Sequence, residues 1–138
     1  MATYVLDTSV AIAWYLPEAF SSEARQWQRR LLNDEANVCV PSLHYWEFGN
    51  VLRTYVRRGE LQQALAQEIY QVHLEAPLVT MEPDRHKTLE CAFEYDATMY
   101  DAVYIALSRS LDAALITAEK TTRPWVVKLG DNVRLVSK

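Results

Sequence analysis

The sequence predicts a single α/β domain with a mostly parallel sheet and helices on both faces. Short runs of β-branched residues alternate along the chain with segments of helical period, and parallel strands require such helical crossovers. The chain has 138 residues, of which 50% are hydrophobic, enough to form one core. No repeat, linker or low-complexity tract interrupts it, so we expect residues 1–138 to form one domain.

Five short runs rich in β-branched residues are expected to be strands. In chain order they are "TYVL" (3–6), "ANVCV" (36–40), "PLVTM" (77–81), "ALIT" (114–117) and "VRLV" (133–136).

Helical patterns fill the intervals between these strands. One helix is expected to start after "PS" at 41 and 42 and to close at Gly59. Residues 61–75 and 100–111 each place apolar side chains along one helical face. These side chains are Leu61, Leu65, Ile69 and Val72 in the first segment, and Tyr100, Val103, Tyr104, Leu107 and Leu111 in the second.

The chain has no feature of a secreted or membrane protein. The first fifteen residues lack the basic and apolar regions of a signal peptide, and no stretch approaches the ~20 apolar residues of a membrane span. Cys39 and Cys91 stand among apolar neighbours, which favours buried thiols over a disulfide. We therefore expect a soluble protein of the reducing cytoplasm that does not bind membranes.

The charge of the chain argues against nucleic-acid binding by electrostatics alone. The net charge is -4, whereas nonspecific binding of a phosphate backbone needs many cations. Arginines nevertheless gather in "ARQWQRR" (24–30) and "RTYVRR" (53–58). A solvated helix face is the more common explanation for such clusters.

Four acidic residues follow, or nearly follow, the predicted strand ends. Asp7 ends the first strand, and Glu119 comes two residues after the fourth. Glu47 lies early in the helix that follows the second strand. Asp101 lies in the first turn of the helix that precedes the fourth strand. The carboxyl ends of parallel strands meet at one edge of a sheet, where ligands bind. We therefore expect these acids to gather.

Each acid also has a purely structural explanation. Asp7 could belong to a turn in which Ser9 caps the next helix, and Thr98 with Asp101 has the spacing of a capping box. The other two acids could simply be exposed to solvent. Four gathered carboxylates, however, would repel one another unless cations neutralise them. Convergence would therefore imply a metal ion.

Three segments resemble the successive motifs of PIN-domain proteins, specifically the VapC toxins of bacterial and archaeal toxin-antitoxin pairs. They are "YVLDTSVAIAWYLPE", "PSLHYWEFGNVLRTYVRRG" and "YDATMYDAVYIALSRSLDAALITAEK". The resemblance covers nearly the whole chain in the order of the family. A lone "LDTS" would be unspecific, whereas the ordered set with "YDAVYIAL" is specific.

The resemblance implies a three-layer α/β/α sandwich whose acidic site holds Mg²⁺ or Mn²⁺ and hydrolyses phosphodiester bonds, usually in RNA. The catalytic and metal-binding acids of the family match Asp7, Glu47, Asp101 and Glu119. The last position is most often aspartate in the family, in a "TAD"-like triplet, but this chain has "TAE". The longer side chain keeps the charge and moves its oxygens outward, so Glu119 is the least secure of the four.

Supporting residues also match the family. Ser9, Asn50 and Thr117 stand at positions that orient the acids through hydrogen bonds. The set of oxygen ligands suits Mg²⁺, a hard cation that retains several waters. Once cations neutralise the acids, RNA can approach, and nearby arginines are expected to hold its backbone. These arginines are Arg53, Arg57 and Arg58.

Other enzyme classes are less well supported. His44, His73 and His86 have no metal-ligand spacing, and no serine or cysteine stands in a nucleophile elbow. A phosphatase with Asp7 as nucleophile would need a second aspartate that "LDTS" lacks.

The main alternative is a PIN-fold module that has lost catalysis and binds protein or RNA. Its only support in the sequence is the departure at Glu119. The resemblance to VapC toxins also implies a homodimer and a cognate VapB-like antitoxin that silences the nuclease.

Overall fold

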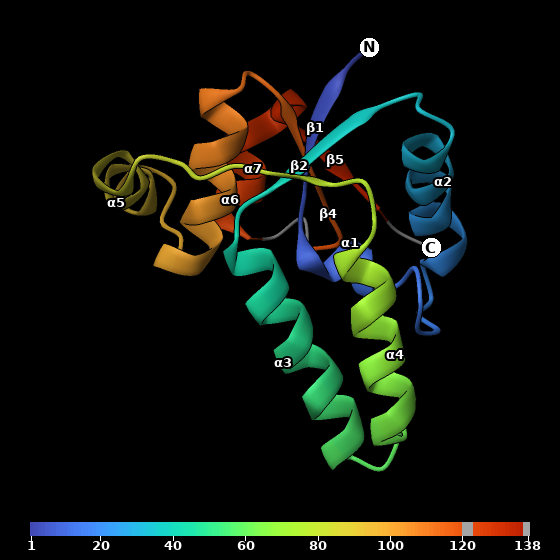
Figure 1. Cartoon of the computed structure of the whole chain (residues 1–138). Coiled ribbons are helices and arrows are strands. Elements are labelled where there is room, and N and C mark those ends of the chain that lie inside the picture. Colours follow the sequence, from blue (N-terminus) through green and yellow to red (C-terminus); the bar gives the residue numbers. More distant parts are fainter. Residues whose placement is uncertain (120–122, 137–138) are drawn as a thin grey trace.

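The sheet has five strands, all of them parallel. The structure is a computed structural model that describes residues 1–119 and 123–136 (Figure 1). The strand order is β3-β2-β1-β4-β5, which places β1 at the centre. The strands are β1 (Thr3–Leu6), β2 (Asn37–Val40), β3 (Val79–Thr80), β4 (Ala114–Thr117) and β5 (Val133–Leu135). All five predicted strands are confirmed, although β3 is only two residues long.

Helices cover both faces of this sheet. They are α1 (Thr8–Ile12), α2 (Ser21–Leu32), α3 (Leu43–Arg57), α4 (Gln63–Leu74), α5 (Arg85–Glu94), α6 (Met99–Ser110) and α7 (Pro124–Leu129), followed by the short 3₁₀ helix η1 (Gly130–Asn132). Alternate residues of a strand point to opposite faces. Val5 and Leu115 therefore pack in one core, with α6 and α7, while Leu6 and Ile116 pack in the other, with α1 and α3. The predicted three-layer α/β/α sandwich is confirmed.

Helices α3 and α4 form a hairpin that extends beyond the sheet (Figure 1). The chain reverses at Gly59, whose φ of 74° lies in the left-handed region that glycine tolerates best. This turn agrees with the predicted end of the middle helix. The free end of the hairpin contributes nothing to the sheet.

The predicted apolar face of α4 is wrong in part. Leu65 and Val72 are 48% and 55% exposed, whereas Ala66, Ile69 and His73 are buried. The reason is that α4 packs mainly on α3 rather than on the sheet. The buried stripe of α4 is narrow and includes the imidazole of His73, which stacks on a side chain of α3. An apolar pattern alone does not reveal such a stripe.

The face of α6 is predicted correctly except at its beginning. Tyr104 and Leu107 are buried, but Tyr100 is 65% exposed. The first turn of α6 is capped as expected, because the Thr98 hydroxyl accepts a hydrogen bond from the backbone N–H of Asp101 at 3.1 Å. This turn thus presents Asp101 at the carboxyl-end edge of the sheet.

The alternative in which Ser9 caps the first helix is wrong. A Ser9 cap would start the helix at Val10, but α1 begins two residues earlier, at Thr8, so Asp7 takes the capping position without a side-chain cap. The Ser9 hydroxyl donates to Asp7 Oδ2 instead. Both cysteines are free thiols, Cys39 buried and Cys91 half-buried. None of the helices in the described part of the chain is long and apolar enough to cross a membrane.

Candidate active site

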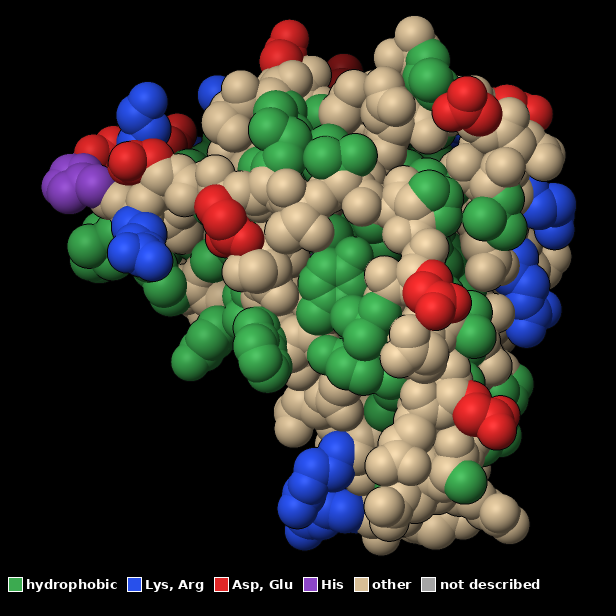
Figure 2. All heavy atoms as spheres, in the orientation of Figure 1, with side chains coloured by type: hydrophobic (Ala, Val, Ile, Leu, Met, Phe, Trp, Pro, Cys, Tyr) green, Lys and Arg blue, Asp and Glu red, His purple; other side chains and the backbone are tan. Residues whose placement is uncertain are grey.

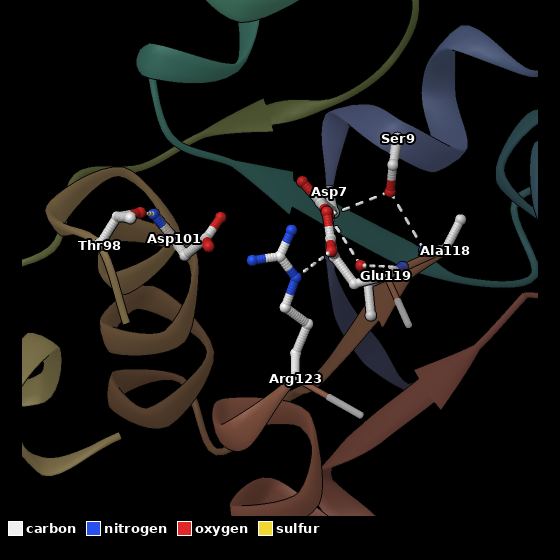
Figure 3. A network of polar contacts seen from close by, with 8 residues as sticks. Asp7, Ser9, Thr98, Asp101, Ala118, Glu119 and Arg123 are labelled. Atoms are coloured by element: carbon white, nitrogen blue, oxygen red, sulfur yellow. Dashed lines mark hydrogen bonds and ion pairs between the residues drawn. The ribbon is translucent and has the colours of Figure 1, made fainter. Parts of the chain in front are cut away.

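The candidate acids lie at the carboxyl-end edge of the sheet. Asp7 directly follows β1, and Glu119 follows β4, which pairs with β1. Asp101 stands at the start of α6 and Glu47 near the start of α3. Figure 3 shows Asp7, Asp101 and Glu119 directed toward a common space. Residues separated by more than 110 positions in the chain thus meet at one edge.

Asp7 is the most constrained of the acids. Its Oδ2 accepts hydrogen bonds from Thr117 Oγ1 at 2.7 Å and from Ser9 Oγ at 3.0 Å. The carboxyl keeps some access to solvent, yet the surrounding protein displaces most of its hydration, which raises its pKa to about 6. The two hydroxyl donors lower this pKa, while the charges of Glu47 and Asp101 raise it further.

Glu47 is held by two hydroxyl groups that the sequence analysis did not single out. Its Oε1 accepts hydrogen bonds from Tyr104 Oη at 2.7 Å and from Thr8 Oγ1 at 3.2 Å. Burial and the charge of Asp101 raise its pKa, and the two donors lower it. Thr8 stands between Asp7 and Ser9 in the first motif, a position that could have drawn attention. The sequence pattern predicts Tyr104 only as part of the apolar face of its helix.

Asp101 and Glu119 have charged and aromatic neighbours instead. Burial and the charge of Glu119 raise the pKa of Asp101, while the guanidinium of Arg123 lowers it. Arg123 Nε lies 3.2 Å from Glu119 Oε2, and its guanidinium extends toward Asp101 (Figure 3). The indole N–H of Trp125 is near enough to lower the pKa of Asp101 but has no partner at hydrogen-bond distance among the described residues.

Arg123 is a site residue that the sequence motifs do not predict. The one signal that could have found it is its position four residues after the last acid, a spacing at which side chains often pair.

The predicted supporting residues differ in where they lie. Ser9 and Thr117 both hydrogen-bond to Asp7. The Ser9 hydroxyl also accepts from the backbone N–H of Ala118, which ties α1 to the end of β4. Asn50 is exposed, and its side chain makes no hydrogen bond to another residue in the described ranges. Two of the three predicted supporting residues, Ser9 and Thr117, therefore contact Asp7, and Asn50 does not.

The three predicted arginines lie on the hairpin, away from the acids. Arg53 and Arg57 line a groove of about 660 Å³ between α3 and α4, and Arg58 follows the end of α3. A helix rises about 1.5 Å per residue, so Arg53 stands roughly 9 Å and Arg57 roughly 15 Å beyond Glu47 along the axis. The structure does not bring them to the acids.

The chemistry of the donors fits a hard divalent cation. Within residues 1–119 and 123–136, no three His, Cys, Asp or Glu side chains are close enough as they stand to form a metal cluster. Mg²⁺, however, is commonly held by only one or two carboxylates, with waters completing its shell. Burial raises the pKa values of Asp7, Glu47 and Asp101, and of these three only Asp101 is influenced by a cation of the described residues, Arg123. Asp7, Glu47 and Asp101 are the carboxylates that would hold such an ion.

Fold and site together define an α/β/α domain with an acidic site at the carboxyl ends of its parallel strands. The chain belongs to the PIN domain family, whose model matches residues 4–122. It is 25% identical over 120 residues to Ribonuclease VapC3 of Pyrobaculum aerophilum, covering 84% of this chain and 88% of that protein.

Solved structures share this fold. A crystal structure of a Pyrobaculum aerophilum protein matches with a TM-score of 0.70 at 22% identity, over 96% of this chain and 83% of the other. A toxin-antitoxin complex from Klebsiella pneumoniae matches with a TM-score of 0.61 at 13% identity, over 95% of each chain. At these identities the likeness shows the fold alone.

Proposed function

We propose that this protein is a metal-dependent endoribonuclease, the toxin of a VapBC-type pair, which a cognate VapB-like antitoxin inhibits. It would act in the cytoplasm as a homodimer and use Mg²⁺ or Mn²⁺. Similarity to a protein named Ribonuclease VapC3 and a fold shared with a toxin-antitoxin complex support the class. The observation that carries the proposal is the gathering of Asp7, Glu47 and Asp101, where the Asp7 pKa is raised by both other charges.

The side chains around the acids suit this chemistry. Thr117 and Ser9 fix the direction of the Asp7 carboxylate, and Tyr104 fixes that of Glu47. Asp101 is anchored through its backbone at the start of α6 and keeps more freedom in its side chain. A divalent ion, when bound, would supply the charge that activates a water and stabilises the scissile phosphate.

The arginines of the hairpin would then bind RNA outside the site of hydrolysis. Arg53 and Arg57 face a groove that runs along α3 away from Glu47. Cations at this distance would contact backbone phosphates beyond the scissile bond and contribute affinity rather than catalysis.

The test is cleavage of bulk RNA by purified, antitoxin-free protein in Mg²⁺ or Mn²⁺. We expect Asp7→Asn and Asp101→Asn to reduce the rate by roughly 1,000-fold, because each removes a negative charge from the ion site. Asp34→Asn is the matched control, since Asp34 is exposed at the opposite edge of the sheet and has a φ of 58° that asparagine tolerates. Cleavage that survives either site substitution would remove the proposed site.

One observation favours the alternative of a PIN-fold module without catalysis. The fourth acid, Glu119, is paired with Arg123 in the structure, so a cation of the chain itself partly neutralises the site. A wild-type protein that binds RNA or antitoxin but cleaves nothing in Mn²⁺ would support this alternative.

A further inference from the structure

A hydrogen-bonded chain of polar side chains leads from Glu47 into the core. It passes through four helices and uses six residues: Glu47 and His44 on α3, Tyr104 on α6, Thr8 on α1, His73 on α4, and Tyr15 just after α1. The successive contacts are Glu47 Oε1 to Tyr104 Oη at 2.7 Å, Tyr104 Oη to Thr8 Oγ1 at 2.8 Å, Thr8 Oγ1 to His44 Nδ1 at 3.3 Å, His44 Nε2 to His73 Nε2 at 2.8 Å, and His73 Nδ1 to Tyr15 Oη at 2.9 Å.

The two imidazoles in this chain are neutral. Both are completely buried. Burial lowers the pKa of His44 to about 3, with a contribution from His73, and it lowers the pKa of His73 to about 4. A neutral imidazole has one N–H donor and one acceptor nitrogen. The contact between the two Nε2 atoms therefore requires that one ring donate and the other accept.

The short contacts at Glu47 determine the direction of every hydrogen bond. An ionised carboxylate only accepts, so the Tyr104 hydroxyl proton lies on the bond to Glu47. The single Thr8 hydroxyl proton is shared between Glu47 Oε1 at 3.2 Å and Tyr104 Oη at 2.8 Å, because the Tyr104 proton is already used. Thr8 has no second proton, so it accepts from His44 Nδ1–H. His44 Nε2 then accepts from His73.

The hydrogen bonds keep the same direction to the end of the hydrogen-bonded chain. His73 uses its single proton at Nε2, so its Nδ1 accepts from the Tyr15 hydroxyl. All five hydrogen bonds thus point toward Glu47. Hydrogen bonds in series polarise one another, and each donor strengthens the next. The two final donors, Tyr104 and Thr8, deliver this effect to the carboxylate.

We propose that His44, His73 and Tyr15 are positioning residues that orient the Thr8 and Tyr104 hydroxyl groups, which in turn hold the Glu47 carboxylate for cation binding. An all-apolar core would avoid the cost of burying these polar groups. The positioning role rests on the proposed function, because its substitutions are tested by Mn²⁺ binding. It also links α4 of the protruding hairpin to the acidic site, because His73 is the donor that α4 contributes.

The direction of the chain can be tested without activity. Imidazole ¹⁵N NMR of the wild-type protein at neutral pH should show His44 as the Nδ1–H tautomer and His73 as the Nε2–H tautomer. The reverse tautomers would mean that the hydrogen bonds are donated in the direction of Tyr15. A doubly protonated imidazole would interrupt the hydrogen-bonded chain. Either result would overturn the inference. This measurement remains valid if the protein proves not to be a nuclease.

Three tyrosine-to-phenylalanine substitutions test the positioning role, with Mn²⁺ affinity as the measured quantity. Tyr104→Phe removes the closer of the two donors to Glu47 and should weaken binding by roughly 10 to 100-fold, as loss of a group that orients a ligand does. Tyr15→Phe removes the first donor and should weaken it by about 2 to 5-fold. Tyr55→Phe is the matched control, because Tyr55 donates to Glu18 at 2.6 Å outside the chain.

The outcomes separate the two proposals. A wild type that binds no Mn²⁺ would contradict the proposed function, whereas the tautomers would still decide the direction of the chain. If Mn²⁺ binds and Tyr15→Phe matches the Tyr55→Phe control, the positioning role is wrong. Thermal melting of each variant identifies any loss of affinity that comes from unfolding.

His73 provides a conservative rescue. His73→Phe keeps a ring that can stack on Phe48, as the imidazole does at 4.1 Å, but removes the donor to His44. It should weaken Mn²⁺ binding by about 10-fold. His73→Gln carries an amide N–H near the place of Nε2 and should restore affinity to within about 3-fold of wild type. Equal affinities of the two variants would contradict the role of His73.

Discussion

The Asp7–Glu47 half and the Asp101–Glu119 half of the acidic site are held in different ways. Asp7 and Glu47 each accept hydrogen bonds from two hydroxyl groups, and all of these donors except Ser9 lie on segments far away in the chain. Glu119 instead pairs with the half-exposed guanidinium of Arg123, and Asp101 faces the same cation. One half is oriented by neutral donors, and the other is balanced by a charge.

This difference separates orientation from neutralisation. Hydroxyl donors fix the direction of a carboxylate without cancelling its charge, so the first half still lacks a cation. An exposed ion pair typically stabilises a protein by less than about 1 kcal/mol, so a competing cation or anion can replace it readily. We infer that the first half is prepared for a metal ion and that the second half adjusts when ligands bind.

The largest expected effect is at Asp7. Asp7→Asn should stabilise the metal-free protein at pH 8 by about 1–3 kcal/mol, because a raised pKa means that the charged form is disfavoured in the fold. The amide oxygen can still accept from Thr117 and Ser9. Urea denaturation in EDTA measures the change. Destabilisation by this substitution would show that the charge of Asp7 supports the fold and would contradict the difference between the halves.

The pH dependence of that gain distinguishes charge from packing. The folded-state pKa of Asp7 is raised from 3.8 to about 6, so its contribution to stability is lost as the pH rises through about 6. His44 and His73 have lowered pKa values and act oppositely, since their contribution is lost as the pH falls below about 6.5. Subtracting the wild-type curve from that of Asp7→Asn removes the histidine effect.

We therefore expect the difference between the two free energies of unfolding to grow between about pH 4 and pH 6 and to stay constant above that range. A difference that is independent of pH would mean that Asp7→Asn acts through packing alone. Adding Mn²⁺ at pH 8 should stabilise the wild type more than the variant, because an ion bound only to the folded state shifts unfolding by mass action.

The edge where the acids meet could be predicted from the sequence because it depends only on local patterns. The β-branched runs identify the strands, and the crossovers make them parallel. Asp7 and Glu119 follow directly, since each comes immediately or nearly so after its strand. The positions of Glu47 and Asp101 depend on helix starts, which "PS" at 41 and 42 and the Thr98 cap mark clearly.

The contacts that orient the acids could not be predicted in this way. Thr8 and Tyr104 meet across 96 residues, and their contact depends on how α6 is rotated against α1. His44 and His73 lack any metal-ligand spacing, as the sequence indicates, but their hydrogen bond arises from the packing of α4 on α3. Helical period gives the side of a helix that is buried, not which polar atoms then come together.

Arg123 offers a smaller effect that tests the second half. Arg123→Gln removes the cation beside Glu119 and Asp101 and should tighten Mn²⁺ binding by about 2 to 5-fold, the range expected for an exposed pair. The gain should shrink in high salt because ions screen exposed charges. Arg134→Gln, which removes an exposed arginine from β5, is the matched control. Weaker Mn²⁺ binding by Arg123→Gln would show that Arg123 assists the ion.

The smallest effect is expected at Glu119. Glu119→Gln releases Arg123, whose guanidinium can then move closer to Asp101, so Mn²⁺ binding should weaken by about 2 to 3-fold. The double variant Glu119→Gln with Arg123→Gln should return close to wild-type affinity, because neither the acid nor its competitor remains. If Glu119→Gln instead reduces RNA cleavage as much as Asp7→Asn, then Glu119 binds the ion directly. The two halves would in that case share one role, and the ion pair with Arg123 would have to break before each turnover.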